Sequence, residues 1–259
     1  MMKLSIMLVG LLAYGVSHAD ELTDRGLALA LAMDRAESGY GDYTVTVTMH
    51  LFGRGGTESI RELRFRTLET ENDGDKSIVV FDRPKDVAGF AALTHAHKRG
   101  TDDQWMYLPD LRRVKRIASD NQAGPFVGSE FAYEDIGSQE PEQYTYRHLG
   151  DAKYDGHACF ELERIPVNRN SGYSRHVVLI DQERHIPLRI DYFDRKGELL
   201  KTLTYSGHQI YLNRFWRPDR AEMVNHQIGK RTVVEYSDYR FVTGLTEQDV
   251  SVDALKRLR

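Results

Sequence analysis

Apolar and polar side chains alternate along the run Tyr43-Thr44-Val45-Thr46-Val47-Thr48-Met49-His50-Leu51. Because successive side chains of a β-strand point to opposite faces, this period of two predicts a strand with one buried and one solvated face. We therefore expect Val45, Val47 and Met49 to lie on the buried face of a sheet.

Further strands are predicted on both sides of clear turn signals. The turns at 53–56 and 72–75 are rich in glycine and separate runs of β-forming residues. The second half of the chain repeats this pattern at short intervals, which is typical of antiparallel sandwiches and barrels. The additional strands are expected at 60–68, 77–81, 158–162, around 177–179, 186–192, 199–205, 209–211, 221–226, 231–236 and 239–242.

Helical signals lie mainly near the two ends of the chain. Thr23 is a suitable N-cap for a helix that ends near Ser38, with Leu27 and Leu31 at helical spacing. A second, short helix is expected over 252–258. No low-complexity linker divides the chain, so the sequence predicts one mainly β domain over residues 20–259, built on a large curved antiparallel sheet with a few helices.

Residues 1–19 have the features of a secretory signal peptide. Lys3 gives a positive start, residues 4–16 are mostly apolar, and Ser17 and Ala19 are the small residues that a cleavage site needs. The apolar run is too short to span a membrane. We expect export to the periplasm and cleavage after Ala19.

The overall composition is that of a globular protein. The 259 residues are 41% hydrophobic and 29% charged, and the formal net charge is -4. This charge provides no basic field for nucleic acid. The single cysteine, Cys159, excludes an internal disulfide, and we expect it to be a small strand residue rather than a nucleophile.

Motifs for cofactors and for common hydrolases are missing from the sequence, so we expect no cofactor. The best metal candidate is the pair His95 and His97, whose imidazoles would share a side of a strand. Two histidines without a third ligand are weak evidence, and we expect a solvated strand end and no metal.

The middle of the chain, residues 84–140, combines short strands, irregular stretches and a dense basic run. Arg112, Arg113, Lys115 and Arg116 indicate either a solvated edge strand or a docking surface for anionic lipid or an acidic partner. Long irregular stretches are often lids or binding loops. The aromatic residues around this run, candidates for core or cavity, are Trp105, Tyr107, Phe126, Phe131 and Tyr133, and the acids beyond it, expected to be solvated, are Glu130, Glu134 and Asp135.

An ordered series of motifs in this middle segment resembles a known family. The motifs are Asp82-Arg83-Pro84-Lys85-Asp86-Val87-Ala88-Gly89, Asp103-Gln104-Trp105-Met106-Tyr107-Leu108-Pro109, Leu111-Arg112-Arg113-Val114-Lys115-Arg116-Ile117 and Gly128-Ser129-Glu130-Phe131-Ala132-Tyr133-Glu134-Asp135. They are similar to those of the outer membrane lipoprotein-sorting proteins, which are LolA-like periplasmic proteins. The resemblance implies an incomplete antiparallel β-barrel of the LolA/LolB type, covered by helices, with an apolar cavity for acyl chains. It also implies association with resistance-nodulation-division (RND) type inner-membrane transporters.

These observations favour a non-enzymatic carrier of a lipid or lipoprotein acyl chain, with transient membrane contact. Binding an acyl chain requires apolar area and no catalytic residue. The alternatives are an envelope sensor of the same fold that binds lipidated or misfolded proteins, and a metal-assisted hydrolase built on His95 and His97. The residues expected at the cavity or its rim are Val45, Val47, Met49, Trp105, Tyr107, Phe131, Leu188 and Ile190, and those expected to dock a partner or membrane are Arg112, Arg113, Lys115 and Arg116.

Overall fold

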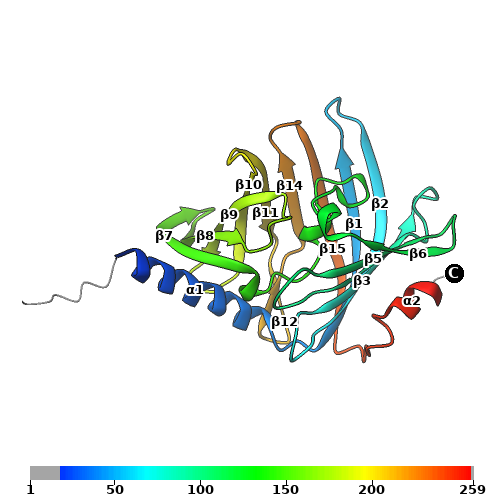
Figure 1. Ribbon diagram of the computed structural model, residues 1–259, viewed down its shortest axis with the longest axis horizontal. Coiled ribbons are helices and arrows are strands. Elements are labelled where there is room, and N and C mark those ends of the chain that lie inside the picture. Colours follow the sequence, from blue (N-terminus) through cyan, green and yellow to red (C-terminus); the bar gives the residue numbers. More distant parts are fainter. Residues whose placement is uncertain (1–17, 258–259) are drawn as a thin grey trace, which may run out of the picture.

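The computed structural model describes residues 18–257 (Figure 1). Most of the predicted signal peptide, residues 1–17, lies outside the described residues, as does Leu258 of the predicted C-terminal helix. Neither of the described α-helices is long and apolar enough to cross a membrane.

One open antiparallel sheet of thirteen strands forms the body of the protein, in the order β6-β5-β4-β3-β2-β1-β15-β14-β11-β10-β9-β8-β7. The remaining two strands, β12 and β13, form a separate hairpin. The sheet curves but does not close, as predicted for an incomplete barrel (Figure 1). The strands are β1 (Asp42–Phe52), β2 (Glu58–Leu68), β3 (Lys76–Arg83), β4 (Ala91–His95), β5 (Asp103–Leu108), β6 (Arg113–Ile117), β7 (Tyr144–Tyr154), β8 (His157–Pro166), β9 (Tyr173–Asp181), β10 (Pro187–Asp194), β11 (Leu199–Ser206), β12 (Gln209–Tyr211), β13 (Phe215–Arg217), β14 (Arg220–Asn225) and β15 (Lys230–Phe241).

The alternating strand β1 lies near the middle of the sheet, between β2 and β15. Val45, Val47 and Met49 are buried in the main core, as their alternation predicts. The two strands predicted at 231–236 and 239–242 are a single strand, β15. A bulge near Asp238, whose φ is 53°, interrupts the pairing of β15 with β1. The bulge also interrupts the alternation of apolar and polar residues, which is why the sequence predicted two strands.

Two kinds of structure cover the concave face of the sheet. Helix α1 (His18–Glu37) crosses β7, and the segment 119–143, which we call the cover segment, packs on strands from both halves of the chain (Figure 1). The cover segment consists of loops and four short 3-10 helices: Ser119–Asn121, Phe126–Gly128, Tyr133–Asp135 and Pro141–Gln143. Together these two covers leave a space above the sheet.

Helix α1 differs from the prediction in its start and in its buried face. It begins at His18, and Thr23 is an interior residue whose hydroxyl donates to the carbonyl of Ala19. Leu27 and Leu31 are exposed, and the face that packs on the sheet contains Gly26 instead. A Cβ on Gly26 would lie 2.8 Å from the backbone nitrogen of Arg147 on β7, so only glycine allows this close approach. Leu29 and Ala30 belong to this buried face, so the helix has two apolar stripes, and hydrophobicity alone could not choose between them.

Helix α2 (Val252–Arg257) packs on the opposite, convex face of the sheet. It covers β4, β5 and β6, and its Leu255 shares a cluster with Ile78 of β3. The next residue, Val79, belongs to the main core on the concave side. The sheet therefore has a hydrophobic core on both faces where α2 covers it. The alternation in the sequence of β1 predicted only one buried face.

Candidate ligand cavity

A cavity of about 960 Å³ lies between the concave face of the sheet and its two covers. This volume is at the upper end of the range typical of sites that enclose a small ligand. Strands from both halves of the sheet contribute to its wall, and so do α1, the cover segment and the β12–β13 hairpin. The apolar and aromatic lining includes Met33, Tyr43, Val45, Phe65, Phe131, Tyr146, Leu162, Val178, Ile190, Tyr192, Leu203, Tyr205, Trp216, Tyr236 and Tyr239.

Three of the eight predicted cavity residues line this space: Val45, Phe131 and Ile190. Val47 and Met49 belong to the same core but are closely packed and do not reach the cavity. The cavity borders β1 near Val45 and does not extend along the strand to Val47 and Met49.

Leu188, Trp105 and Tyr107 lie away from the cavity, contrary to our expectation. A register irregularity in β10 adds one residue at Leu188 and turns its side chain into a separate cluster with Cys159 and Ile186. Trp105 and Tyr107 project from β5 to the convex face, where they pack beneath α2. Alternation identifies which residues share a face of β5 but not which face is concave.

A buried arginine lies among the apolar and aromatic side chains of the wall. The Arg164 side chain on β8 lines the cavity, and the residue is only 5% exposed. Its Nε donates to Nδ1 of His176 at 2.9 Å, and its guanidinium lies 4.6 Å from the centre of the Tyr144 ring. A long contact of 3.4 Å joins its Nη2 to Oε1 of Gln139. No carboxylate among residues 18–257 forms an ion pair with it, so its charge has no protein counter-ion there.

His176 fixes the orientation of this arginine. Its burial, together with the nearby cations Arg164 and Lys201, holds the pKa of His176 well below its usual value, so the ring stays neutral. A neutral ring can accept at Nδ1 only when its proton is on Nε2. That nitrogen is buried and has no partner among the described residues.

Tyrosine hydroxyls add further polar groups to the cavity wall. Tyr205 and Tyr236 line the cavity, and their hydroxyl groups hydrogen-bond none of the described residues. Burial raises the pKa of both, so the hydroxyls remain protonated donors. The cavity thus combines apolar walls with a few unused donors.

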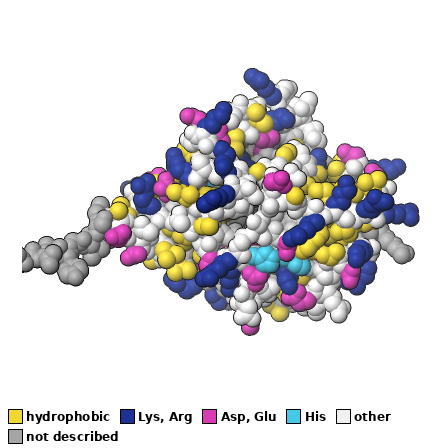
Figure 2. Space-filling model, viewed as in Figure 1, with side chains coloured by type: hydrophobic (Ala, Val, Ile, Leu, Met, Phe, Trp, Pro, Cys, Tyr) yellow, Lys and Arg dark blue, Asp and Glu magenta, His cyan; other side chains and the backbone are white. Residues whose placement is uncertain are grey.

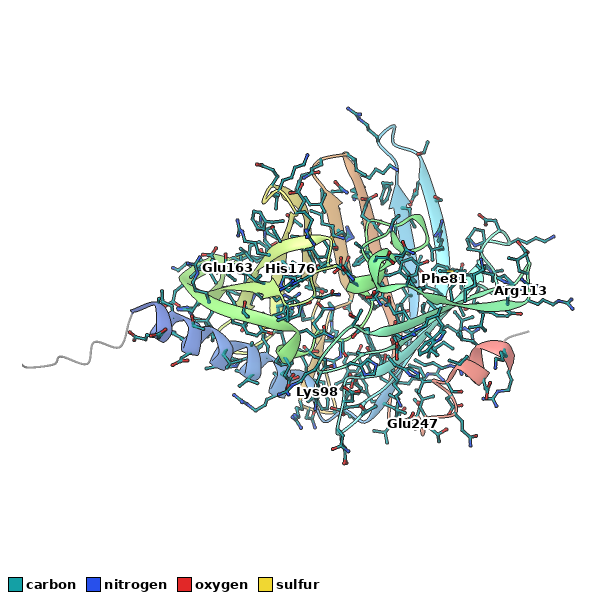
Figure 3. The ribbon with its side chains drawn as sticks, viewed as in Figure 1. Phe81, Lys98, Arg113, Glu163, His176 and Glu247 are labelled. Carbon is teal, nitrogen blue, oxygen red and sulfur yellow. The ribbon has the colours of Figure 1, made fainter. Side chains whose placement is uncertain are left out.

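The other cations at the cavity are paired or lie at its rim. Arg217 of β13 contacts Glu37 of α1 at 2.9 Å, which ties the hairpin to the helix. Lys98 lies near the end of α1 in Figure 3, and its Nζ donates to the carbonyl of Glu71. Arg164 is therefore the buried cation in the described wall of the cavity that has no carboxylate partner.

Carboxylates gather where the cavity meets the hairpin between β2 and β3. Asp75 accepts a hydrogen bond from the hydroxyl of Tyr40, and burial raises its pKa to about 6. Asp34 on α1 also has a raised pKa, first because of burial and second because of Glu142. The half-exposed rim is therefore acidic, in contrast to the buried guanidinium of Arg164.

The cover segment is attached to the sheet by polar contacts, which corrects the expectation of solvated acids. Asp135 forms a buried ion pair with Lys201 of β11 at 2.8 Å, with both side chains at most 5% exposed. Glu130 accepts from Asn225 of β14 at 2.8 Å, and Glu134 accepts from the backbone of Gly172. Each partner lies at least 38 residues away in the chain, so local sequence could not reveal these contacts.

His95 and His97 do not converge on one point. His95 bonds to the carbonyl of Val250 at 2.7 Å, while Nδ1 of His97 contacts Asp73 at 2.6 Å and its Nε2 contacts Asp103 at 3.3 Å. Among residues 18–257, no group of three or more His, Cys, Asp or Glu side chains is arranged to hold a metal ion. Strand β4 ends at His95, so the predicted shared side does not extend to His97.

The basic run forms the edge strand of the sheet, one of the two interpretations of its sequence. Figures 2 and 3 show this end of the molecule, with Arg113 at its margin and Lys and Arg side chains around it. Arg112, Arg113 and Lys115 are exposed and pair with no described carboxylate, whereas Arg116 pairs with Asp103. Whether this edge docks to a membrane or partner remains a prediction.

Comparisons with known proteins agree with this architecture. A family model described as an uncharacterized protein matches residues 73–257. A crystal structure of a protein domain from Vibrio parahaemolyticus, provisionally named as outer membrane lipoprotein-sorting, is 48% identical and has a TM-score of 0.89. The alignment covers 91% of this chain and 100% of that one. The chain belongs to the outer membrane lipoprotein-sorting protein family.

Two further crystal structures place this family among related folds. A DUF1329 family protein from Desulfovibrio piger is 29% identical, with a TM-score of 0.85 over 90% of this chain and 99% of that one. A LolA superfamily protein from Nitrosomonas europaea is 21% identical, with a TM-score of 0.70 over 90% of this chain and 99% of that one, which shows the shared fold. No curated protein matches the chain.

Proposed function

We propose that this protein is a non-enzymatic periplasmic carrier that encloses the acyl chain of a lipid or lipoprotein between its sheet and its covers. The observation that supports this proposal is the cavity of about 960 Å³, whose wall includes many apolar and aromatic side chains. Each buried CH₂ of a ligand contributes about 0.8 kcal/mol, so a chain of roughly 16 carbons gains on the order of 10 kcal/mol before the costs of binding.

Export and partnership are further parts of this proposal. Cleavage after Ala19 would leave a mature chain that begins at Asp20, and the mass of the protein isolated from the periplasm tests it. The RND-type transporter implied by the family resemblance is a proposed partner, to which the basic edge offers a docking surface. A carrier of this kind must also release its cargo, and movement of the cover segment would open the cavity.

A cavity-filling substitution tests the proposed binding. Ile190→Trp places a larger ring in the cavity wall, so it should reduce the affinity for a fluorescent fatty acid more than it reduces stability. Ile165→Trp is the matched control, because Ile165 lies on β8, does not line the cavity and is 43% exposed. If the wild type does not bind the fatty acid, the carrier proposal fails. If Ile190→Trp binds as tightly as the wild type, the cavity is not the site.

Intrinsic fluorescence tests the location of the ligand independently. Of the two tryptophans, Trp216 lines the cavity and Trp105 packs under α2 on the other face. We expect fatty acid to change the emission of Trp105→Phe, which retains Trp216, and to leave the emission of Trp216→Phe almost unchanged. The reverse pattern would place the ligand on the convex face.

A further inference from the structure

The cavity contains a charge that the proposed apolar ligand does not explain. Moving a guanidinium from water into a protein interior is costly unless an opposite charge or hydrogen bonds compensate for it. Arg164 has one firm hydrogen bond, to a neutral histidine, and an aromatic contact. Its Nη1 donates to none of the described residues, so the guanidinium has capacity for a further acceptor.

The neighbouring acids are already engaged. Asp135 lines the cavity, pairs with Lys201 and accepts a hydrogen bond from the hydroxyl of Tyr173. Glu37 pairs with Arg217. A simple rearrangement that neutralised Arg164 with either acid would leave another buried cation unpaired.

The surroundings of Arg164 fit an anion attached to an apolar chain. Arginine presents a planar set of donors that suits the two oxygens of a carboxylate or the oxygens of a phosphate. Tyr205 lines the same cavity as Arg164 and has a hydroxyl without a described partner. Next to them, Leu162, Val178 and Ile190 line the same space and offer the apolar surface.

We propose that Arg164 is the receptor for the anionic head group, carboxylate or phosphate, of a single-chain amphiphile that enters the cavity head first. This inference rests on the proposed function and specifies its ligand class. His176 is a positioning residue, because it holds the guanidinium through Nε and leaves Nη1 without a described partner and Nη2 with only the long contact to Gln139. The acidic rim would repel a head group left there, which favours its transfer to Arg164, the buried cation without a described carboxylate partner.

Three ligands with the same chain distinguish the chemistry: laurate, dodecyl phosphate and 1-dodecanol, each titrated into the full mature protein by calorimetry. The wild type should bind one or both anions at least about tenfold more tightly than the alcohol, as expected for a charge-assisted bidentate contact. A preference for laurate indicates a fatty acid, and a preference for dodecyl phosphate indicates a phospholipid-type head group. Inorganic phosphate alone should not compete, because it lacks the chain.

The variant Arg164→Met should lose this preference while it keeps the affinity for 1-dodecanol within a few fold. Arg164→Lys keeps the charge but not the planar fork, and should lie between Arg164→Met and the wild type. The matched control is Arg64→Met, because Arg64 pairs with Asp82 on the surface outside the cavity. It should behave as the wild type with all three ligands.

Two results would overturn the inference while the carrier proposal stands. One is equal affinity of the wild type for laurate, dodecyl phosphate and 1-dodecanol, a comparison that requires no variant. The other is unchanged anion affinity in a folded Arg164→Met protein. If the wild type binds none of the three ligands, the carrier proposal itself fails and the inference falls with it.

Discussion

At the scale of single residues, the ion pair between Asp135 and Lys201 joins the cover segment to the sheet. Both side chains are buried, and Lys201 also donates to the carbonyl of Glu130. A buried pair adds little net stability compared with apolar residues, but removal of one partner leaves an uncompensated charge. The pair therefore acts mainly to determine where the cover segment lies.

Lys201→Met should reduce the free energy of unfolding by about 3–5 kcal/mol, because the Asp135 carboxylate would stay buried without its partner. Urea denaturation measures this change. Lys256→Met is the control, since Lys256 forms an exposed pair with Asp253 and its loss should cost less than about 1 kcal/mol. Equal small losses in both variants would show that the cover segment is not held by this pair.

The pKa of Asp75 predicts a pH dependence. Burial raises it from 3.8 to about 6, so the folded protein holds this proton more tightly than the unfolded chain does. Stability contributed by Asp75 therefore falls as the pH rises from about 4 to about 6, and the cost is constant above that range. Asp75→Asn removes this titration, and its melting temperature relative to the wild type should be higher at pH 7 than at pH 4. A difference that is independent of pH would contradict the raised pKa.

Some residues of the cavity could be predicted from the sequence, and others could not. Val45 and Ile190 follow from alternation, because a strand with one apolar face must turn that face to a core. Arg164 had no such signal. It lies in a strand where charged and apolar residues are mixed. Its importance depends on the lack of a carboxylate partner, which only the folded structure shows.

At the scale of the elements, the edge strand β6 is the most accessible candidate for docking. It ends the sheet with exposed cations, a common protection against edge-to-edge aggregation, so its charge alone does not establish a partner. The docking prediction concerns the three cations without a described carboxylate partner: Arg112, Arg113 and Lys115.

Reversal of these three charges to Glu should leave the fold intact, because exposed substitutions usually cost within about 0.5 kcal/mol each. It should weaken binding to vesicles that contain anionic lipid, and added salt should weaken binding by the wild type. The control is the triple reversal of Lys153, Lys196 and Lys230, which are exposed on other elements. Sedimentation with the vesicles measures the binding of the wild type and of the two triple variants. Equal binding of the two triple variants at low salt would identify β6 as a solvated edge.

Most strands were predictable because each has its own period of two and its own turn signals. The register and the layers were not. The glycine contact between α1 and β7, the bulges near Leu188 and Asp238, and the second core under α2 all depend on contacts between distant parts of the chain. For this reason the predicted helix face and the predicted positions of Trp105 and Tyr107 differ from the structure.

At the scale of the whole molecule, the cavity follows from an open, curved sheet whose concave face has two separate covers. One edge of the sheet is β6 and the other is β7, so the curvature produces a concave face without closure. Helix α1 and the cover segment occupy only part of this face. The remaining space is what we assign to an acyl chain.

Native mass spectrometry of the mature protein, purified from the periplasm of its own host, tests this assignment most directly. We expect a species whose extra mass equals one acyl-bearing lipid per chain, identified by extraction and fragmentation. The lipid should be lost or strongly reduced in Ile190→Trp and retained in Ile165→Trp. A wild-type protein that carries only its own mass, and takes up no lipid when lipid is added, would contradict the carrier function.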